Sequence, residues 1–262
     1  MLAPLRQRGN HGTLIHPHRA IATVRVTALD ILLAIVLTLG TTVAVGASFG
    51  RIGQLWTWMF TLLAEPLGFS GGVVSRTISD FPFTGVAVPA YAGMPASPAG
   101  MTWWVTLVVT IVVLAGSLLM RRGFLPLAYA LRLCAFIQAT ALVFFHFAPA
   151  RFPYTLQSYT SSMLMSGMAV MAAVPLTLGL TFYLMDVGII RKIGVTVAML
   201  VHLLVFIPLQ YMVQSYVIAH GSLLLMPLLF MLFGLVPEVM ILIALYGWGM
   251  SWRVTRVRAM RE

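Results

Sequence analysis

Long apolar runs separated by short polar segments occupy most of the chain from residue 27 onwards. An α-helix needs about 20 predominantly apolar residues to cross the hydrocarbon core of a bilayer, and each of these runs is long enough. The pattern predicts six membrane-spanning helices, at residues 27–49, 102–120, 124–148, 160–186, 193–218 and 222–250. We therefore expect an all-α integral membrane protein, with a tail at 1–25, a six-helix domain at 26–252 and a basic tail at 253–262.

The composition agrees with this pattern. Of 262 residues, 60% are hydrophobic and 8% are charged, whereas about a quarter of the residues of a soluble domain are charged. The net charge of +10 would suggest nucleic acid in a soluble protein. Here the arginines gather at the ends of apolar runs and at both termini, where they orient a membrane protein. The predicted partner is the lipid bilayer, and no nucleic acid.

The basic residues also predict an orientation, because they concentrate in alternate loops. One side holds Arg6, Arg8, Arg19, Arg25, Arg121, Arg122, Arg191, Lys192, Arg253, Arg256, Arg258 and Arg261, and the other side holds Arg51, Arg76 and Arg151. By the positive-inside rule, both termini are cytoplasmic. Only one of the sixteen basic residues is a lysine, a skew that favours a GC-rich bacterial source and hence a bacterial inner membrane. The first run is alternatively a signal peptide, although its apolar core exceeds the usual 7–15 residues.

The longest connection, residues 50–101, follows the first span on the predicted outer side. Its first part carries Trp56 and Trp58 in apolar surroundings, as helices in the headgroup region do. A re-entrant segment is the competing interpretation. The remainder is rich in Gly, Pro and Ser, and we expect it to form an ordered coil that lies on the helices.

Three ionisable residues lie deep inside predicted spans. Arg132, His202 and Glu238 each fall about 13–18 Å from the inner boundary, counted at about 1.5 Å per residue. Charged groups within spans usually face other helices and pair with one another. We expect Arg132 to pair with Glu238, with His202 beside them. The cluster is then either a substrate or proton site or a buried pair that fixes helix register. Pro237, next to Glu238, favours a broken helix there.

Small residues predict where helices touch, because they let backbones approach closely. Gly46 and Gly50 form a GxxxG pair, suited to a dimer seam or an internal contact. Ser162 and Ser166 begin a small-residue ridge that continues through Ala169 and Ala173. The methionines of the same span are better explained as apolar filler than as a Cu(I) path, since no Cys or His accompanies them. The motif QSY recurs at 157–159 and 214–216, which we interpret as coincidence.

Catalytic and cofactor chemistry has little support in the sequence. The single cysteine, Cys134, would need a nearby base to act as a nucleophile, and His202 is the candidate at comparable depth. Neither a zinc-protease, a P-loop nor a serine-hydrolase motif is present. His146 and His220 do not match as axial haem ligands, because His220 falls in a loop. We predict no metal, no cofactor and, on balance, no enzyme.

The functional expectation has three parts. The first is a non-catalytic subunit or scaffold of a bacterial envelope assembly, which associates with other membrane subunits. The alternative is a small homo-oligomeric transporter or channel that uses Arg132, His202 and Glu238. The least favoured is an intramembrane enzyme that uses Cys134.

Overall fold

The computed structural model describes residues 28–79, 83–93, 95, 98–120, 122–181 and 189–251. Within these ranges, six helical segments are long and apolar enough to cross a membrane, which confirms a multi-pass helical membrane protein. Five are α1 (Ala28–Ala64), α2 (Met101–Leu118), α3 (Leu125–Phe147), α4 (Leu156–Thr181) and α5 (Ile189–His220), and the sixth is divided into α6 (Met226–Phe233) and α7 (Val236–Ser251). Three short 3-10 turns connect them: η3 (Arg122–Phe124), η4 (Pro149–Arg151) and η5 (Leu223–Leu225). The predicted tails at 1–25 and 253–262 lie outside the described residues.

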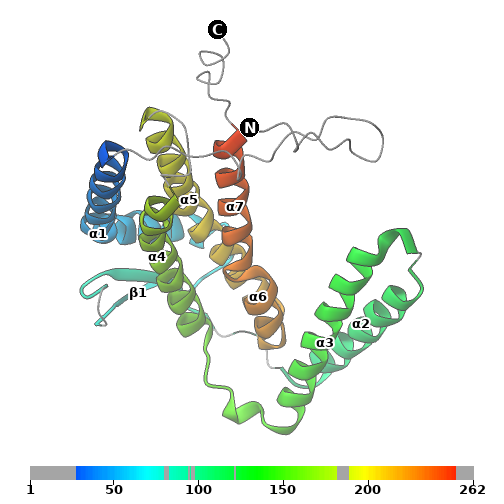
Figure 1. Cartoon of the computed structure of the whole chain (residues 1–262). Helices are drawn as coiled ribbons and strands as arrows, with labels where there is room; N and C mark the ends of the chain where they lie inside the picture. Colours follow the sequence, from blue (N-terminus) through cyan, green and yellow to red (C-terminus); the bar gives the residue numbers. More distant parts are fainter. Residues whose placement is uncertain are drawn as a thin grey trace, which may run out of the picture.

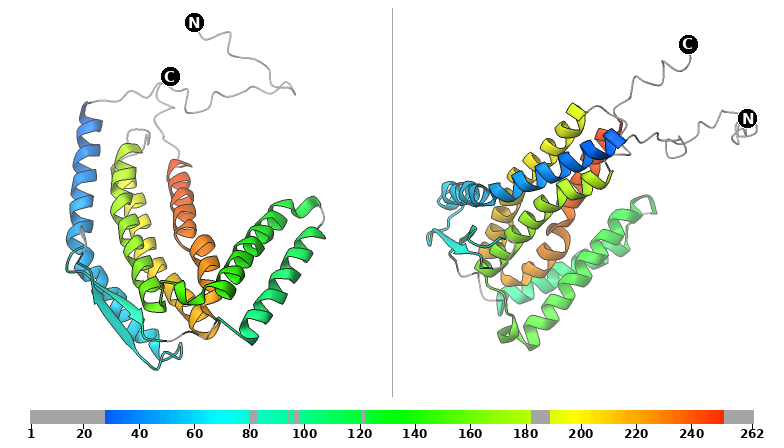
Figure 2. Two further views of the ribbon diagram at one scale, coloured as in Figure 1. Left: turned by 90° about the horizontal axis from the view of Figure 1, so that it is seen from below. Right: turned by 60° about the vertical axis from the view of Figure 1, so that its left-hand side comes forward.

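The helices form a main bundle and a separate hairpin (Figure 1). α4 packs between α1 and α5, and α5 packs against α7. α2 and α3 pack against each other and reach the remaining helices through α6 and η5. We name the end where α1 begins and α7 ends the inner end, after the predicted orientation, and the opposite one the outer end. The hairpin meets the bundle near the outer end and leans away from α7 toward the inner end (Figures 1 and 2).

The connection after the first span differs from the expectation in two ways. α1 continues through Trp56 and Trp58 as one helix of 37 residues, and its second half turns sharply away from its first (Figure 2). The expected coil is instead an antiparallel pair of strands, β1 (Val73–Thr77) and β2 (Ala87–Tyr91), with Val73 opposite Tyr91. β2 packs on α1 and α4, so apolar side chains of the loop are buried rather than solvated.

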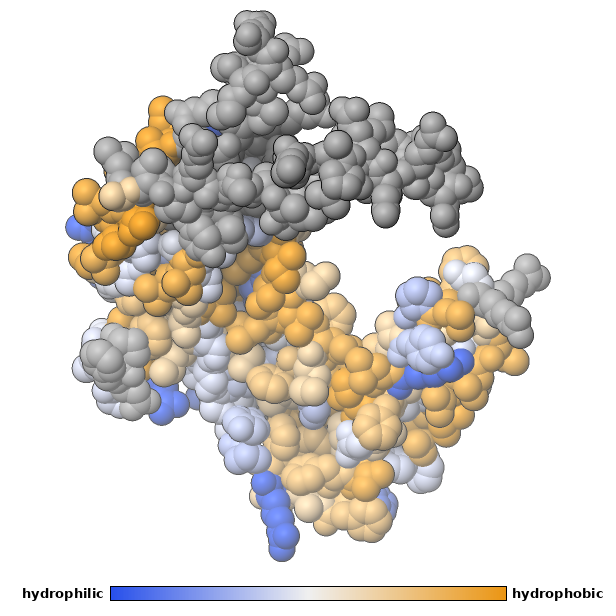
Figure 3. Space-filling view, in the orientation of Figure 1, coloured by the Kyte–Doolittle hydropathy of each residue, from blue (hydrophilic) through white to orange (hydrophobic). Residues whose placement is uncertain are grey.

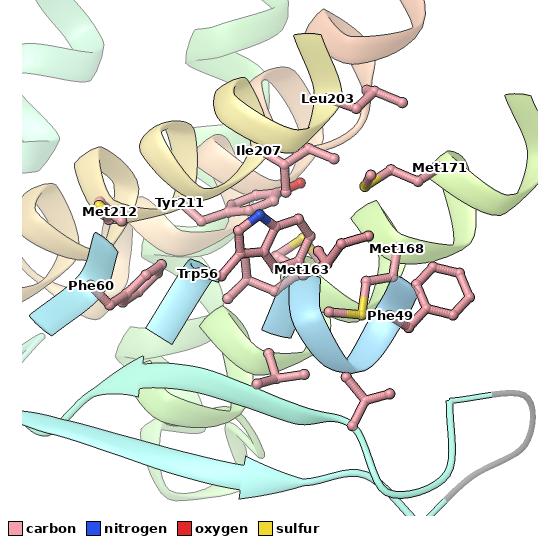
Figure 4. Close-up of a cluster of buried hydrophobic side chains, with 14 of the residues drawn as sticks. Phe49, Trp56, Phe60, Met163, Met168, Met171, Leu203, Ile207, Tyr211 and Met212 are labelled. Carbon is pink, nitrogen blue, oxygen red and sulfur yellow. The ribbon is translucent and has the colours of Figure 1, made fainter. Parts of the chain in front are cut away.

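The main core lies where the second half of α1 meets α4, α5 and β2 (Figure 4). Trp56 is fully buried there, between Ile207 and Tyr211 of α5 and the methionines of α4. Its Nε1 donates a hydrogen bond to the Leu204 carbonyl at 2.9 Å. Pro208 lies four residues after Leu204 and has no N–H to donate to that carbonyl. The indole therefore replaces the missing backbone donor.

The strand pair is fixed to the bundle by Tyr91. Its ring stacks on Phe69 with a centroid distance of 3.9 Å, and its hydroxyl donates to the Phe60 carbonyl at 3.2 Å. Burial raises the pKa of Tyr91 to about 12, because the low dielectric disfavours the phenolate. The hydroxyl therefore keeps its proton and remains a donor over the physiological pH range.

The predicted small-residue contacts are not those that the chain uses internally. Gly46 and Gly50 are exposed, and a Cβ at either would meet nothing within 4 Å. The internal contact expected there is therefore wrong, whereas a dimer seam stays a prediction. Ser162 is also exposed and Ser166 only half-buried. The close approach on α4 occurs at Gly167, where a Cβ would lie 2.7 Å from Ile207 Cγ2.

Apolar side chains also cover the outside of the helices. The space-filling view shows hydrophobic residues over the bundle and over the α2–α3 hairpin, and a notch between the two (Figure 3). Many large aliphatic and aromatic residues of α1, α2 and α3 are exposed. A water-soluble protein rarely exposes so large an apolar surface, so this surface is suited to lipid.

Candidate functional site at the broken sixth helix

The sixth span is interrupted at Gly234 and Leu235, and the interruption follows from the sequence. Pro237 lies in the first turn of α7, where proline is tolerated. It has no N–H for the carbonyl four residues earlier, that of Phe233. Two glutamines of α5 supply donors instead: Gln210 Nε2 at 2.7 Å, and the Nε2 of Gln214. The break is therefore stabilised by side chains of the neighbouring helix.

Glu238 begins α7 on the far side of the interruption, and its side chain is fully buried. Its Oε1 accepts hydrogen bonds from Gln210 Nε2 at 2.9 Å and from the Tyr211 hydroxyl at 3.3 Å. Its Oε2 is buried and has no hydrogen-bond partner. Leaving one polar atom of this kind unpaired costs about 1–3 kcal/mol, and more for a charged group. Glu238 therefore has one satisfied oxygen and one oxygen free to bind a ligand.

A polar network extends from the break to the outer end of α4. The Tyr159 hydroxyl donates to Gln214 Oε1 at 2.6 Å, and the hydroxyls of Thr160 and Ser215 are hydrogen-bonded at 2.9 Å. All four residues are buried. The two QSY segments thus lie side by side on α4 and α5, so their residues meet in space, whatever the origin of the repeated motif.

Arg132 does not contact Glu238 in this structure. It is half-buried on α3, where its Nη2 donates to the Ser117 carbonyl of α2 at 3.2 Å. The guanidinium carbon lies 5.3 Å from the centre of the Tyr129 ring, within the range of a cation–π contact. Its Nε is buried without a partner. The predicted Arg132–Glu238 pair is thus replaced by separate partners, because α3 leans away from α7.

His202 lies on α5 but outside the network around Glu238. Its ring stacks on Phe206 at 4.9 Å, and its Nε2 is buried without a partner. Gln210, which does contact Glu238, lies two helical turns further along, at a distance of about 12 Å. Cys134 is half-buried on α3, in the hairpin rather than in the bundle that contains His202. The structure therefore does not assemble the predicted layer of Arg132, His202 and Glu238, nor a pair of Cys134 with His202.

Four residues of the site were not predicted from the sequence: Tyr159, Gln210, Tyr211 and Gln214. The available signal was Pro237, since a proline within a span leaves a carbonyl that another group must satisfy. The glutamines of α5 are the nearest polar side chains in the sequence able to do so, but their pairing with α6 requires knowledge of which helices are neighbours.

The chemistry of the site is that of weak ligation by oxygen. One carboxylate, two phenols and the backbone carbonyls of a broken helix are ligands suited to a proton or a small hard cation. Among the described residues, no group of three or more His, Cys, Asp or Glu side chains could hold a metal ion. Comparison with known proteins adds no further identification: no family model, no curated protein and no solved structure matches the chain.

Proposed function

We propose that the protein is a small transporter or channel that moves protons or another small cation across a membrane, with Glu238 as the cation-binding group. The observation that carries this proposal is the fully buried Glu238, with one unpartnered oxygen, at the break of a membrane-spanning helix. Ionisable residues within spans mark ion pathways, and broken helices near the midplane form the ion sites of many transporters.

Orientation and location belong to the same proposal. The alternation of basic residues supports cytoplasmic termini, and the arginine-rich composition supports a bacterial inner membrane. In this orientation the space between α3 and α7 widens toward the cytoplasm. The notch of Figure 3 would then be the inner vestibule, with the α6–α7 break at its outer end.

Flux into liposomes tests the proposal. The purified protein is reconstituted with a pH-sensitive dye inside, and proton entry is recorded under an imposed membrane potential, with sodium or potassium gradients as the other probes. We expect an accelerated flux of at least one of these ions and its loss in Glu238→Gln. Glu65→Gln is the matched control, because Glu65 is exposed outside the bundle. Wild-type flux no greater than that of empty liposomes, or equal flux in both variants, would contradict the proposal.

A non-catalytic subunit of an envelope assembly is the second candidate. It is favoured by the α2–α3 hairpin, which touches the rest of the described chain mainly through α6 and η5 and exposes apolar residues on its remaining sides. Such a hairpin is suited to packing against another membrane protein as well as against lipid. Native mass spectrometry of the protein, extracted in mild detergent, tests this candidate. Stoichiometric foreign subunits are its expected result, and a homogeneous monomer or homo-oligomer would contradict it.

A further inference from the structure

We propose that Gln210 couples the charge of Glu238 to the angle between α6 and α7, and through it to the position of an arm formed by α2, α3, η5 and α6. The inference rests on the proposed function, since it takes Glu238 as the group that binds the cation. It adds a positioning residue and a moving part to that site.

The first step is a competition for hydrogens. Gln210 Nε2 lies 2.7 Å from the Phe233 carbonyl, 2.8 Å from the Gly234 carbonyl and 2.9 Å from Glu238 Oε1. A side-chain amide has two hydrogens to donate, so it cannot serve all three acceptors fully. Two of the acceptors belong to the break itself, and the third belongs to the carboxyl group.

The second step is the effect of charge on this competition. Hydrogen bonds to an ionised carboxylate are roughly twice as strong as those to a neutral acceptor. An unoccupied, ionised Glu238 therefore draws one Nε2 hydrogen to Oε1. A proton or small cation bound at Oε2 reduces that attraction, and both hydrogens become available to the carbonyls of Phe233 and Gly234. Occupancy of Glu238 thus changes how firmly the break is held to α5.

The third step is mechanical. α6 packs on α3 and η5, whereas α7 packs on α5. The interruption at Gly234 and Leu235 is therefore the joint between the arm and the main bundle. Gly234 leaves little room for a side chain, since a Cβ there would collide with the Phe230 carbonyl. A small change of backbone direction at this joint is amplified along α3, which leans away from α7 toward the inner end (Figure 1).

The titratable groups around Glu238 are few. Tyr211 of α5 contacts it directly, Tyr159 of α4 reaches it through Gln214, and His202 of α5 and Tyr246 of α7 lie on the same two helices toward the inner end. Within the described residues, no basic side chain and no second carboxylate is hydrogen-bonded to it. A pH response of the arm that disappears with Glu238 is therefore assigned to this one carboxyl.

Distance measurement between two spin labels tests the coupling. The full chain carries Cys134→Ser, with labels at Phe136→Cys of α3 and Ile243→Cys of α7, both exposed positions. The protein is reconstituted in lipid nanodiscs, and distance distributions are recorded at about pH 5 and about pH 9, on either side of the usual range of a carboxyl and a histidine. We expect the distribution to differ between the two pH values. In Glu238→Gln, we expect the acidic distribution at both.

Two glutamine variants separate coupling from simple loss of a hydrogen bond. Gln210→Leu removes the group that contacts both the break and Glu238, so the distribution should become independent of pH. Gln214→Leu is the matched control, because Gln214 donates to the same Phe233 carbonyl but does not contact Glu238. It should shift the distribution yet keep the pH response. Gln210→Met serves as a second variant if Gln210→Leu fails to fold.

A wild-type distribution that is the same at both pH values overturns the coupling, and so does a pH response that survives in the folded Gln210 variant. These outcomes are distinct from failure of the proposed function. If flux depends on Glu238 while the distribution does not respond to pH, transport stands and the coupling fails. If the distribution responds while no flux depends on Glu238, the arm moves but the protein does not carry ions through this site.

Discussion

At the scale of single residues, prolines inside the spans explain the two most specific polar contacts of the bundle. Pro208 frees the Leu204 carbonyl, which Trp56 satisfies, and Pro237 frees the Phe233 carbonyl, which Gln210 and Gln214 satisfy. In lipid, water is not present to bond such carbonyls. A polar side chain opposite an in-span proline is therefore a structural requirement first, and any function is built upon it.

The indole of Trp56 provides a direct test of this requirement. Trp56→Phe keeps an aromatic ring but removes the N–H, so the Leu204 carbonyl is left unpaired. We expect a loss of about 1–3 kcal/mol of stability, seen as a lower temperature at which the protein leaves its monodisperse peak in detergent. Trp58→Phe is the control, since Trp58 is 60% exposed. Equal effects of the two substitutions would show that the hydrogen bond contributes nothing.

Glycines of two kinds give a second residue-scale test. Gly167→Ala would place a Cβ 2.7 Å from Ile207 Cγ2, and overpacking of this kind costs about 1–3 kcal/mol. Gly46→Ala meets nothing within 4 Å and should leave the stability of the monomer unchanged. If Gly46 and Gly50 form a dimer seam, Gly46→Ala should instead weaken self-association, which analytical ultracentrifugation measures. A greater loss of monomer stability in Gly46→Ala than in Gly167→Ala would contradict the observed packing.

How far the sequence predicts such contacts depends on their range. Burial of Glu238 follows from its place in an apolar run, and the break beside it follows from Pro237. The partner of Glu238 does not follow, because depth along a span says nothing about which helices are neighbours. Arg132 and Glu238 match in predicted depth, yet they lie on helices that diverge. Gln210 and Tyr211 were passed over because uncharged side chains carry a weaker sequence signal.

At the scale of elements, the apolar runs predict the spans well and the connections poorly. The ends of α2 and α3 fall close to the predicted boundaries, since the runs end abruptly at Gly, Pro and Arg. α1 continues to Ala64 because its second half packs on α5 and β2 instead of lying free at the lipid surface. The strands β1 and β2 were missed, because their five residues each gain stability from burial on α1 and α4 rather than from a local pattern.

The broken helix gives the element-scale prediction. In Pro237→Ala, residue 237 regains an N–H that can bond to the Phe233 carbonyl, and α6 and α7 can approach one continuous helix. Loss of the Gln214 donor should then matter less. We expect Gln214→Leu to cost about 0.5–1 kcal/mol less in the Pro237→Ala background than in wild type, measured as thermal stability in detergent. The cost to the Tyr159 hydroxyl is common to both backgrounds and cancels. Additive effects would mean that Gln214 does not substitute for the missing N–H.

At the scale of the whole molecule, the main bundle and the arm divide the work of the fold. The bundle of α1, α4, α5 and α7, closed by the strand pair, contains most of the buried apolar core. The arm has its own small cluster around Leu142, Phe145 and Leu224. A well-packed body joined to a lightly packed hairpin at a broken helix is an arrangement suited to hinge motion. It is equally suited to a hairpin that docks on another subunit.

The direction in which this arrangement faces is the whole-molecule prediction. Ser75 of β1 and Gly123 of η3 are both exposed and lie at opposite ends of the molecule (Figure 1). In a Cys134→Ser background in bacterial spheroplasts, a membrane-impermeant maleimide should label Ser75→Cys at once. It should label Gly123→Cys only after the membrane is opened, because the basic loops stay cytoplasmic. The reverse pattern would contradict the predicted orientation. The widening between α3 and α7 would then face outward, and ions would approach the break from outside the cell.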